Sequence, residues 1–177
     1  METQTQWVAT SDQQRLAVRT FGDISKPALV LVHGYPDHQE VWKNVIVYLP
    51  DYFIVTYDVR GAGDSSIPKY IRDYRLERLS MDLEEVVNAV LPGQSFHLVA
   101  HDWGSIQSWE SVTDPRFEGR ILSFTTISGL LILITHLFRN KLQFIFHLKT
   151  FLLLIFDFSI CNYRTISQLY TQKVLIL

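Results

Sequence analysis

The segment Phe96–Gly104 constrains the fold of this chain more than any other part of it. Its first five residues have the pattern of a short buried strand, and a helix-compatible stretch follows. Ala100, Asp102 and Gly104 between them form a small–x–acid–x–small pattern. A sharp strand-to-helix turn needs small residues two positions before and after its vertex. We therefore predict such a turn with Asp102 at its vertex, at the carboxyl end of a strand, where open α/β sheets bind ligands.

Two roles are open for Asp102 on this segment alone. A carboxylate at a turn vertex can act as a nucleophile, and the helix N-terminus beside it favours the ionised form. Asp is also a common helix N-cap, in which case the side chain only satisfies backbone N–H groups. The segment by itself does not separate the two roles.

Strand-length and helix-length patterns alternate over residues 28–127, joined by short connections. This alternation predicts an α/β fold with a mostly parallel sheet and right-handed crossovers. Strands are expected at 28–32, 53–57, 96–100 and 121–127, with an N-terminal strand pair at 7–10 and 15–20. Helices are expected over 105–112, from Asp73 to Val90, and after residue 37, where one face would carry Val41, Trp42, Val45, Ile46 and Leu49.

Composition sets limits on function and location. The formal net charge is −2, so there is no basic excess to indicate nucleic-acid binding. The one cysteine, Cys161, excludes an internal disulfide and gives no cysteine metal site, and no pattern indicates a metal or a cofactor. The polar N-terminus lacks the features of a signal peptide, so we expect a cytoplasmic protein.

The composition changes abruptly after Gly129. All 8 Gly and all 6 Pro of the chain lie at or before this residue. Residues 1–129 hold 11 Lys/Arg and 17 Asp/Glu, a net charge of −6, whereas residues 130–177 hold 5 and 1, a net charge of +4. The apolar runs 130–134 and 151–156 are far shorter than the ~20 residues that span a bilayer, so a membrane span is not expected, although association through 130–160 stays open. We predict two segments, 1–129 and 130–177, that need separate interpretations.

Three loops are expected at the carboxyl ends of neighbouring strands: His33–Asp37, Asp58–Ser66 and the turn at Asp102. With these motifs, residues 1–129 resemble the α/β-hydrolase fold superfamily. An Asp vertex followed by Trp103, together with the aromatic Tyr35 in the first loop, resembles the epoxide hydrolase branch rather than the serine esterases. The segment also looks like the hydrolase half of bacterial proteins that fuse such a domain to a short-chain dehydrogenase.

The resemblance implies roles for particular residues. Asp102 would attack an epoxide carbon and form an alkyl ester, which a His-activated water then hydrolyses. The backbone N–H groups of Trp103 and Tyr35 would form the oxyanion hole. The residues around them would shape or brace the site without taking part in the chemistry: His33, Gly34, Pro36, Asp37, Asp58, Arg60, His101 and Gly104. The implied substrate is a small epoxide or a similar apolar electrophile, with no cofactor.

Other parts of the family pattern are missing from the sequence. The chain departs from that pattern at Ser128–Gly129, before the base His, its acid, the cap and the last strands. His136 and His147 lie too early, in sequence unlike the family's, to be assigned as the base. We therefore expect a truncated and inactive hydrolase, with residues 130–177 arising from a shifted reading frame or a truncated gene. Strand 121–127 would then be an exposed edge open to self-association.

Three alternatives remain open at this stage. A haloalkane dehalogenase shares the Asp vertex but needs a side-chain donor for halide, often at the position of Tyr35, which fits that role poorly. A non-catalytic binding or interaction fragment would need no base. A membrane-associated fragment would depend on residues 130–160.

Overall fold

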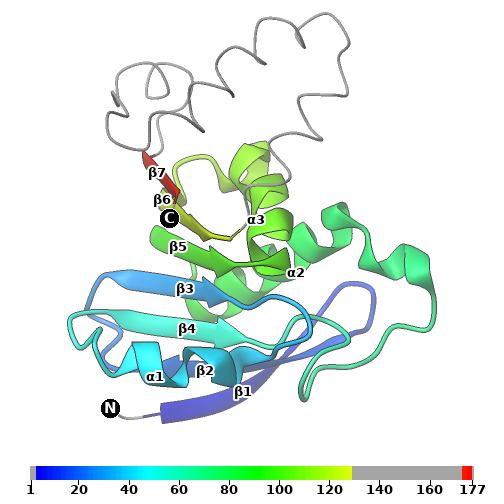
Figure 1. Cartoon of the computed structure of the whole chain (residues 1–177), viewed down its shortest axis with the longest axis horizontal. Coiled ribbons are helices and arrows are strands. Elements are labelled where there is room, and N and C mark those ends of the chain that lie inside the picture. The colour runs from blue at the N-terminus through cyan, green and yellow to red at the C-terminus, as the bar shows by residue number, and fades with distance from the viewer. Residues whose placement is uncertain (1–2, 129–172, 177) are drawn as a thin grey trace, which may run out of the picture. The chain divides into compact units, whose positions relative to one another are not determined.

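The structure is a computed structural model that describes residues 3–128 and 173–176 (Figure 1). Its centre is a seven-stranded sheet in the order β1-β2-β4-β3-β5-β6-β7. The strands are β1 (Thr3–Ala9), β2 (Arg15–Phe21), β3 (Ala28–Val32), β4 (Phe53–Tyr57), β5 (Phe96–His101), β6 (Ile121–Ile127) and β7 (Lys173–Ile176). The five strands expected between residues 15 and 127 are therefore present within a residue of their predicted bounds, and β1 begins four residues earlier than expected.

The directions of the strands bring three loops to one edge of the sheet. β3 pairs in parallel with β4 on one side and with β5 on the other, and β5 pairs in parallel with β6. The N-terminal pairs, β1 with β2 and β2 with β4, are antiparallel. In register, Val32 at the end of β3 lies opposite Tyr57 of β4 and Ala100 of β5. The predicted mostly parallel α/β sheet is confirmed, and the chain leaves β3, β4 and β5 at the same level.

Helices cover the two faces of the sheet unequally. The longer ones, α2 (Leu76–Val90) and α3 (Trp103–Thr113), lie on one face, and the single turn α1 (Lys43–Ile46) lies on the other (Figure 1). Short 3₁₀ turns complete the connections at η1 (Gln39–Trp42), η2 (Ile71–Tyr74) and η3 (Pro115–Phe117).

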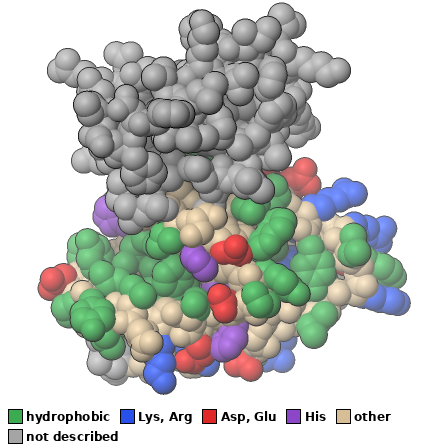
Figure 2. Space-filling view, in the orientation of Figure 1, with side chains coloured by type: hydrophobic (Ala, Val, Ile, Leu, Met, Phe, Trp, Pro, Cys, Tyr) green, Lys and Arg blue, Asp and Glu red, His purple; other side chains and the backbone are tan. Residues whose placement is uncertain are grey.

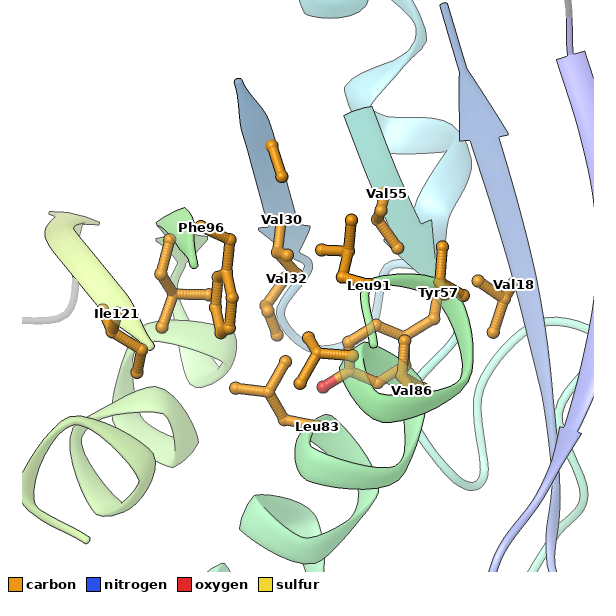
Figure 3. Close-up of a cluster of buried hydrophobic side chains, with 14 of the residues drawn as sticks. Val18, Val30, Val32, Val55, Tyr57, Leu83, Val86, Leu91, Phe96 and Ile121 are labelled. Carbon is orange, nitrogen blue, oxygen red and sulfur yellow. The ribbon is translucent and has the colours of Figure 1, made fainter. Parts of the chain in front are cut away.

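The larger core lies between the sheet and α2 (Figure 3). Leu83 and Val86 of α2 pack with Val30, Val55 and other strand residues, all of them buried. The opposite face of the same strands packs Leu29, Leu31 and Ile54 against Trp42 and Ile46. Because β3 is buried on both faces, it needs an apolar residue at every position, which is the continuous run seen in the sequence.

The helix expected after the first loop is shorter and less regular than predicted. A 3₁₀ turn and one α-helical turn replace the continuous helix, and the side chains of Val41 and Val45 are exposed. Trp42 and Ile46, four residues apart, are buried against the sheet, and Leu49 packs beside them while only partly buried. Similarly, Asp73 lies in the 3₁₀ turn η2, and α2 itself begins at Leu76.

The expected exposed edge at β6 is wrong, because β7 lies beside β6 in the sheet. Self-association through an open β6 edge therefore loses its basis. The other expectations for the C-terminal segment, including membrane association through 130–160 and the unassigned His136 and His147, lie outside the described residues. Among the helices that the structure does describe, none combines the length and the hydrophobicity needed to cross a membrane.

We expect Leu83→Ala to destabilise the chain by about 2–5 kcal/mol, because it removes a fully buried side chain from the larger core and leaves a cavity. Leu122→Ala, which makes the same chemical change at an exposed position of β6, should cost less than about 1 kcal/mol. Urea unfolding of both 177-residue variants measures the difference, and equal losses would contradict this description of the core.

Candidate active site

Asp102 lies between β5 and α3 in a backbone conformation that is rare for a residue with a side chain. Its φ is 54° and its ψ is −126°, and non-glycine residues at positive φ carry strain of about 1–3 kcal/mol. The Asp102 N–H donates to the Ile127 carbonyl oxygen at 2.9 Å, and the Asp102 carbonyl oxygen accepts from the Ser105 N–H at 2.9 Å. The Ser105 hydroxyl donates to the Ala100 carbonyl oxygen at 2.8 Å and so braces the turn from below. The predicted strand–vertex–helix turn is therefore present.

Two glycines allow this turn and the loop after β3 to approach closely. A Cβ atom on Gly104 would lie 2.4 Å from the His33 carbonyl oxygen, and one on Gly34 would lie 2.6 Å from the Asp102 side chain. Neither clash can be relieved by a rotamer change alone, because the atoms are backbone atoms or lie next to the backbone. Glycine at both positions is what places the first loop directly against the Asp102 vertex.

One backbone N–H group donates to the Asp102 carboxylate, and the first turn of α3 begins directly after this residue. The Tyr35 N–H donates to Asp102 Oδ1 at 3.2 Å. Trp103 is the first residue of α3, and the N–H groups of a first helical turn have no partner within the helix. The side chains of Tyr35 and Trp103 are 77% and 56% exposed. The rings of both residues are therefore largely exposed, while the Tyr35 backbone contacts the Asp102 carboxylate.

His33 fixes the loop after β3 through both of its ring nitrogens. Nδ1 lies 2.8 Å from the Gly34 carbonyl oxygen, and Nε2 accepts from the Val59 N–H at 2.9 Å. Since Nε2 is the acceptor, the proton resides on Nδ1 and the ring is neutral. Burial lowers the pKa of His33, against the opposing effect of its hydrogen bond to Gly34. His33 thus joins the first and second loops and has no free nitrogen for catalysis.

Asp58 braces the second loop from inside the protein. Its carboxylate accepts from the Gln39 N–H at 2.7 Å and from the Asp64 N–H at 3.0 Å. The Ser65 hydroxyl donates to the Asp58 carbonyl oxygen at 2.6 Å. Gln39, which sequence reasoning did not single out, is buried and also accepts from the Thr56 hydroxyl. All of these contacts act on loop shape and none points to a substrate.

Arg60 holds three elements together through charged groups that are distant in sequence. Its guanidinium makes paired bonds to Asp82 of α2, at 2.6 and 2.5 Å, and donates to Asp12 of the β1–β2 turn at 2.8 Å. It also donates to the Asp73 carbonyl oxygen at 2.9 Å. Burial raises the pKa of Asp82 to about 6 despite the Arg60 charge. Burial also raises the pKa of Asp12, but the hydrogen bonds from Arg60 and Thr10 outweigh it and leave that pKa below its ordinary value.

Three further residues were predicted to belong to the site: Pro36, Asp37 and His101. Within the described residues, none of them is hydrogen-bonded to the Asp102 carboxylate. Pro36 follows Tyr35 through a cis peptide bond and is exposed. Asp37 is half-buried and makes no hydrogen bond or ion pair within residues 3–128. His101 is half-buried, and its Nδ1 has no hydrogen-bond partner in the described part of the chain. Across the same residues, no cluster of three His, Cys, Asp or Glu side chains is arranged to hold a metal ion.

The site thus has an acid at a strained strand-to-helix vertex and a glycine-containing loop packed against it. Comparison of the sequence with protein families gives a result consistent with this geometry. Residues 27–152 match the alpha/beta hydrolase fold family. The chain belongs to this family. The match continues 23 residues past Gly129, so the likeness of this α/β hydrolase to its family does not stop where the sequence composition changes.

Sequence relatives of this α/β hydrolase include proteins named for oxidoreductase and epoxide hydrolase activity. It is 42% identical over 123 residues to the probable oxidoreductase EphD of Mycobacterium tuberculosis, covering 69% of this chain and 21% of that protein. It is 27% identical over 160 residues to mouse epoxide hydrolase 4, covering 86% of this chain and 44% of the mouse protein.

Solved structures similar to this chain include an epoxide hydrolase. The crystal structure of epoxide hydrolase A from Mycobacterium thermoresistibile superposes with a TM-score of 0.64 at 28% identity, covering 71% of this chain and 39% of that one. The present chain therefore spans less than half the length of each of these three proteins.

We expect Asp102→Gly to be more stable than Asp102→Ala by about 1 kcal/mol, because glycine adopts positive φ without strain. The order should reverse at Glu118, an exposed residue with φ of −57°. There the Ala variant should be more stable than the Gly variant. Urea unfolding of the four variants tests this. If Ala were the more stable residue at both positions, the vertex would not be strained.

Protonation of His33 should destabilise the folded chain as pH falls. Its folded pKa lies below the ordinary value of 6.5, so the unfolded chain takes up the proton first. The stability that His33 contributes is therefore complete above pH 6.5 and declines as pH drops below it, by at most about 1.4 kcal/mol per pH unit. Unfolding free energies of wild type and His33→Gln between pH 7.5 and 5.5 should converge toward the acid side, whereas parallel curves would contradict the assignment.

Proposed function

We propose that this chain carries the nucleophilic half of an epoxide hydrolase, with Asp102 as the attacking group. The observation that carries the proposal is the vertex itself. It holds a carboxylate in a strained turn, with one oxygen already hydrogen-bonded to the Tyr35 N–H and the start of α3 beside it. A side chain that served only to cap α3 would accept from N–H groups of that helix, and the Asp102 side chain accepts from none of them.

In the first step, an Asp102 carboxylate oxygen attacks one carbon of the epoxide ring. A C–O bond of the ester forms while the ring C–O bond to the same carbon breaks, and the ring oxygen leaves as an alkoxide that takes a proton from an acid or from water. No atom is lost, so the product is an ester of Asp102 carrying the whole epoxide. The attacking group is the carboxylate form of Asp102.

In the second step, water loses a proton to a base and attacks the ester carbonyl carbon, and the carbonyl oxygen becomes an oxyanion. When this intermediate collapses, the bond between the carbonyl carbon and the alkoxy oxygen breaks, the alkoxide takes a proton to give the diol, and the Asp102 carboxylate is restored. The N–H groups of Tyr35 and Trp103 lie on the loop and helix that flank the vertex, where they can donate to the oxyanion. Removing one such donor typically costs about 3–4 kcal/mol of transition-state stabilisation. We infer that His33 and Gly34 serve this step by holding the Tyr35 N–H in place, since His33 itself has no free nitrogen.

The assignment to epoxides follows the relatives. Mouse epoxide hydrolase 4 and the Mycobacterium thermoresistibile epoxide hydrolase A are similar to this chain in sequence and in fold. Their names supply the substrate class, and the vertex supplies a nucleophile suited to it. We assign no base for the second step: His33 is engaged through both ring nitrogens, and within residues 3–128 no hydrogen bond joins His101 to the carboxylate.

The test is covalent capture of the first intermediate. Incubating the 177-residue chain with styrene oxide should add the full mass of the epoxide to the protein, and peptide mapping should place the addition on Asp102. Asp102→Asn should abolish the addition, because an amide is a far weaker nucleophile than a carboxylate. Asp37→Asn, which neutralises a neighbouring half-buried carboxylate of the first loop, should leave it unchanged.

Two results would overturn the proposal. One is an adduct on a different carboxylate, or none at all, from a chain that circular dichroism shows to be folded. The other is preference for a bromoalkane, in which alkylation of Asp102 releases bromide while styrene oxide fails to react; this would identify a haloalkane dehalogenase instead.

A further inference from the structure

A cluster of large apolar side chains is exposed on the segment that joins the second loop to α2. Ile71 is 93% exposed and Ile67 is 78% exposed, and both Tyr70 and Tyr74 lie at the surface beside them. Exposed apolar residues that occur singly are ordinary, but four within eight residues form a patch that calls for a partner. We call residues 67–78 the basic-aromatic segment.

Positive charge is concentrated on the same segment. It holds four of the 11 Lys and Arg of residues 1–129, against only two acids, Asp73 and Glu77. The basic residues are Lys69, Arg72, Arg75 and Arg78, and all four are exposed. The rest of residues 1–129 holds 7 Lys/Arg and 15 Asp/Glu, which gives a net charge of −8. The segment thus carries a net charge of +2 within residues 1–129, which are otherwise acidic in sequence (in Figure 2, blue and green side chains lie together at the right).

The segment is held in a defined shape. The Arg60 guanidinium donates to the Asp73 carbonyl oxygen, and the Asp73 carboxylate accepts from the Tyr70 N–H at 3.3 Å. Cationic groups of Lys69 and Arg72 lie over the Tyr70 ring, at 5.3 and 4.7 Å from its centroid. The basic-aromatic segment is therefore an ordered turn with exposed apolar and aromatic side chains and cationic groups next to them.

We propose that the basic-aromatic segment binds the surface of an anionic lipid bilayer. Tyrosine rings favour the membrane–water interface, and isoleucine side chains gain by entering the boundary between headgroups and acyl chains. Lys and Arg next to them gain from the negative potential of anionic headgroups. The segment would bind at the membrane–water interface without crossing the bilayer, so no long apolar helix is needed.

The two isoleucines favour lipid over the other polyanions that a basic patch could attract. Nucleic-acid surfaces are contacted by cations, by hydrogen-bonding groups and by aromatic rings that stack on bases. Almost fully exposed aliphatic side chains such as Ile67 and Ile71 add nothing to those contacts, but they are the residues that anchor a protein in an apolar layer.

The experiment is co-sedimentation of the 177-residue chain with vesicles. Binding is expected to phosphatidylserine–phosphatidylcholine vesicles at 50 mM salt, and to weaken on phosphatidylcholine alone and at 500 mM salt. Ile71→Ser should lower the partition coefficient about tenfold, and Arg72→Gln about fivefold. Because both side chains are exposed, neither variant should alter the circular dichroism spectrum. No substrate is added, so the outcome is independent of the chemistry at Asp102.

Two control variants separate this segment from the rest of the chain. Val47→Ser removes another exposed aliphatic side chain, 66% exposed, and Lys43→Gln removes another exposed cation. Both should bind vesicles as wild type does. The proposal is overturned if vesicles do not bind, if binding ignores lipid charge, or if Ile71→Ser binds as wild type does, which would place the contact elsewhere in the chain. It is also overturned if the chain binds a DNA oligonucleotide, and not vesicles, in an Arg72-dependent manner.

Discussion

The contact between Gly104 and the end of β3 is the constraint on which the arrangement of the site depends. A side chain on Gly104 would collide with the carbonyl oxygens of Val32 and His33, and a side chain on Gly34 would collide with Asp102. Backbone therefore meets backbone at the junction of β3, β5 and α3. As a result, the position of the Tyr35 N–H relative to the Asp102 carboxylate is set by main-chain packing and not by flexible side chains. This is the kind of preorganisation that stabilises a developing oxyanion without further movement.

The surrounding hydrogen bonds explain how the protein tolerates the strain at Asp102. A conformation such as this costs about 1–3 kcal/mol. It is held by the Asp102 N–H bond to Ile127, by the Ser105 N–H bond to Asp102, and by the Ser105 hydroxyl bond to Ala100. At about 1 kcal/mol each, these three bonds together match the strain. β6 is therefore part of the site although it contributes no reacting group, because its Ile127 carbonyl oxygen fixes the vertex.

Features that depend on a local sequence pattern could be predicted from the sequence. Features that depend on contacts between residues distant in sequence could not. Buried parallel strands need unbroken apolar runs, so β3 and β4 were located to the residue, and the spacing of Ala100, Asp102 and Gly104 was sufficient to locate the vertex. The partners of Arg60 could not be found in this way. Asp82 and Asp12 are 22 and 48 residues away from it, and no short-range spacing relates them. The expected helix after β3 failed for a similar reason, since only three of its five apolar residues, Trp42, Ile46 and Leu49, pack against the sheet.

The fold sets the positions of the groups at the vertex, but the exposure of the residues beside it sets how strongly those groups interact. The side chains of Tyr35 and Trp103 are mostly exposed, so within the described residues the carboxylate and its N–H donors lie close to solvent. In water, the interaction of two N–H dipoles with an oxyanion is weakened by the high dielectric constant, and the same donors gain strength when water is excluded. The fold of residues 3–128 therefore accounts for where the proposed nucleophile and the Tyr35 N–H lie. The rate at which they act depends on what covers Tyr35 and Trp103, because the cover sets the dielectric environment of the developing charge.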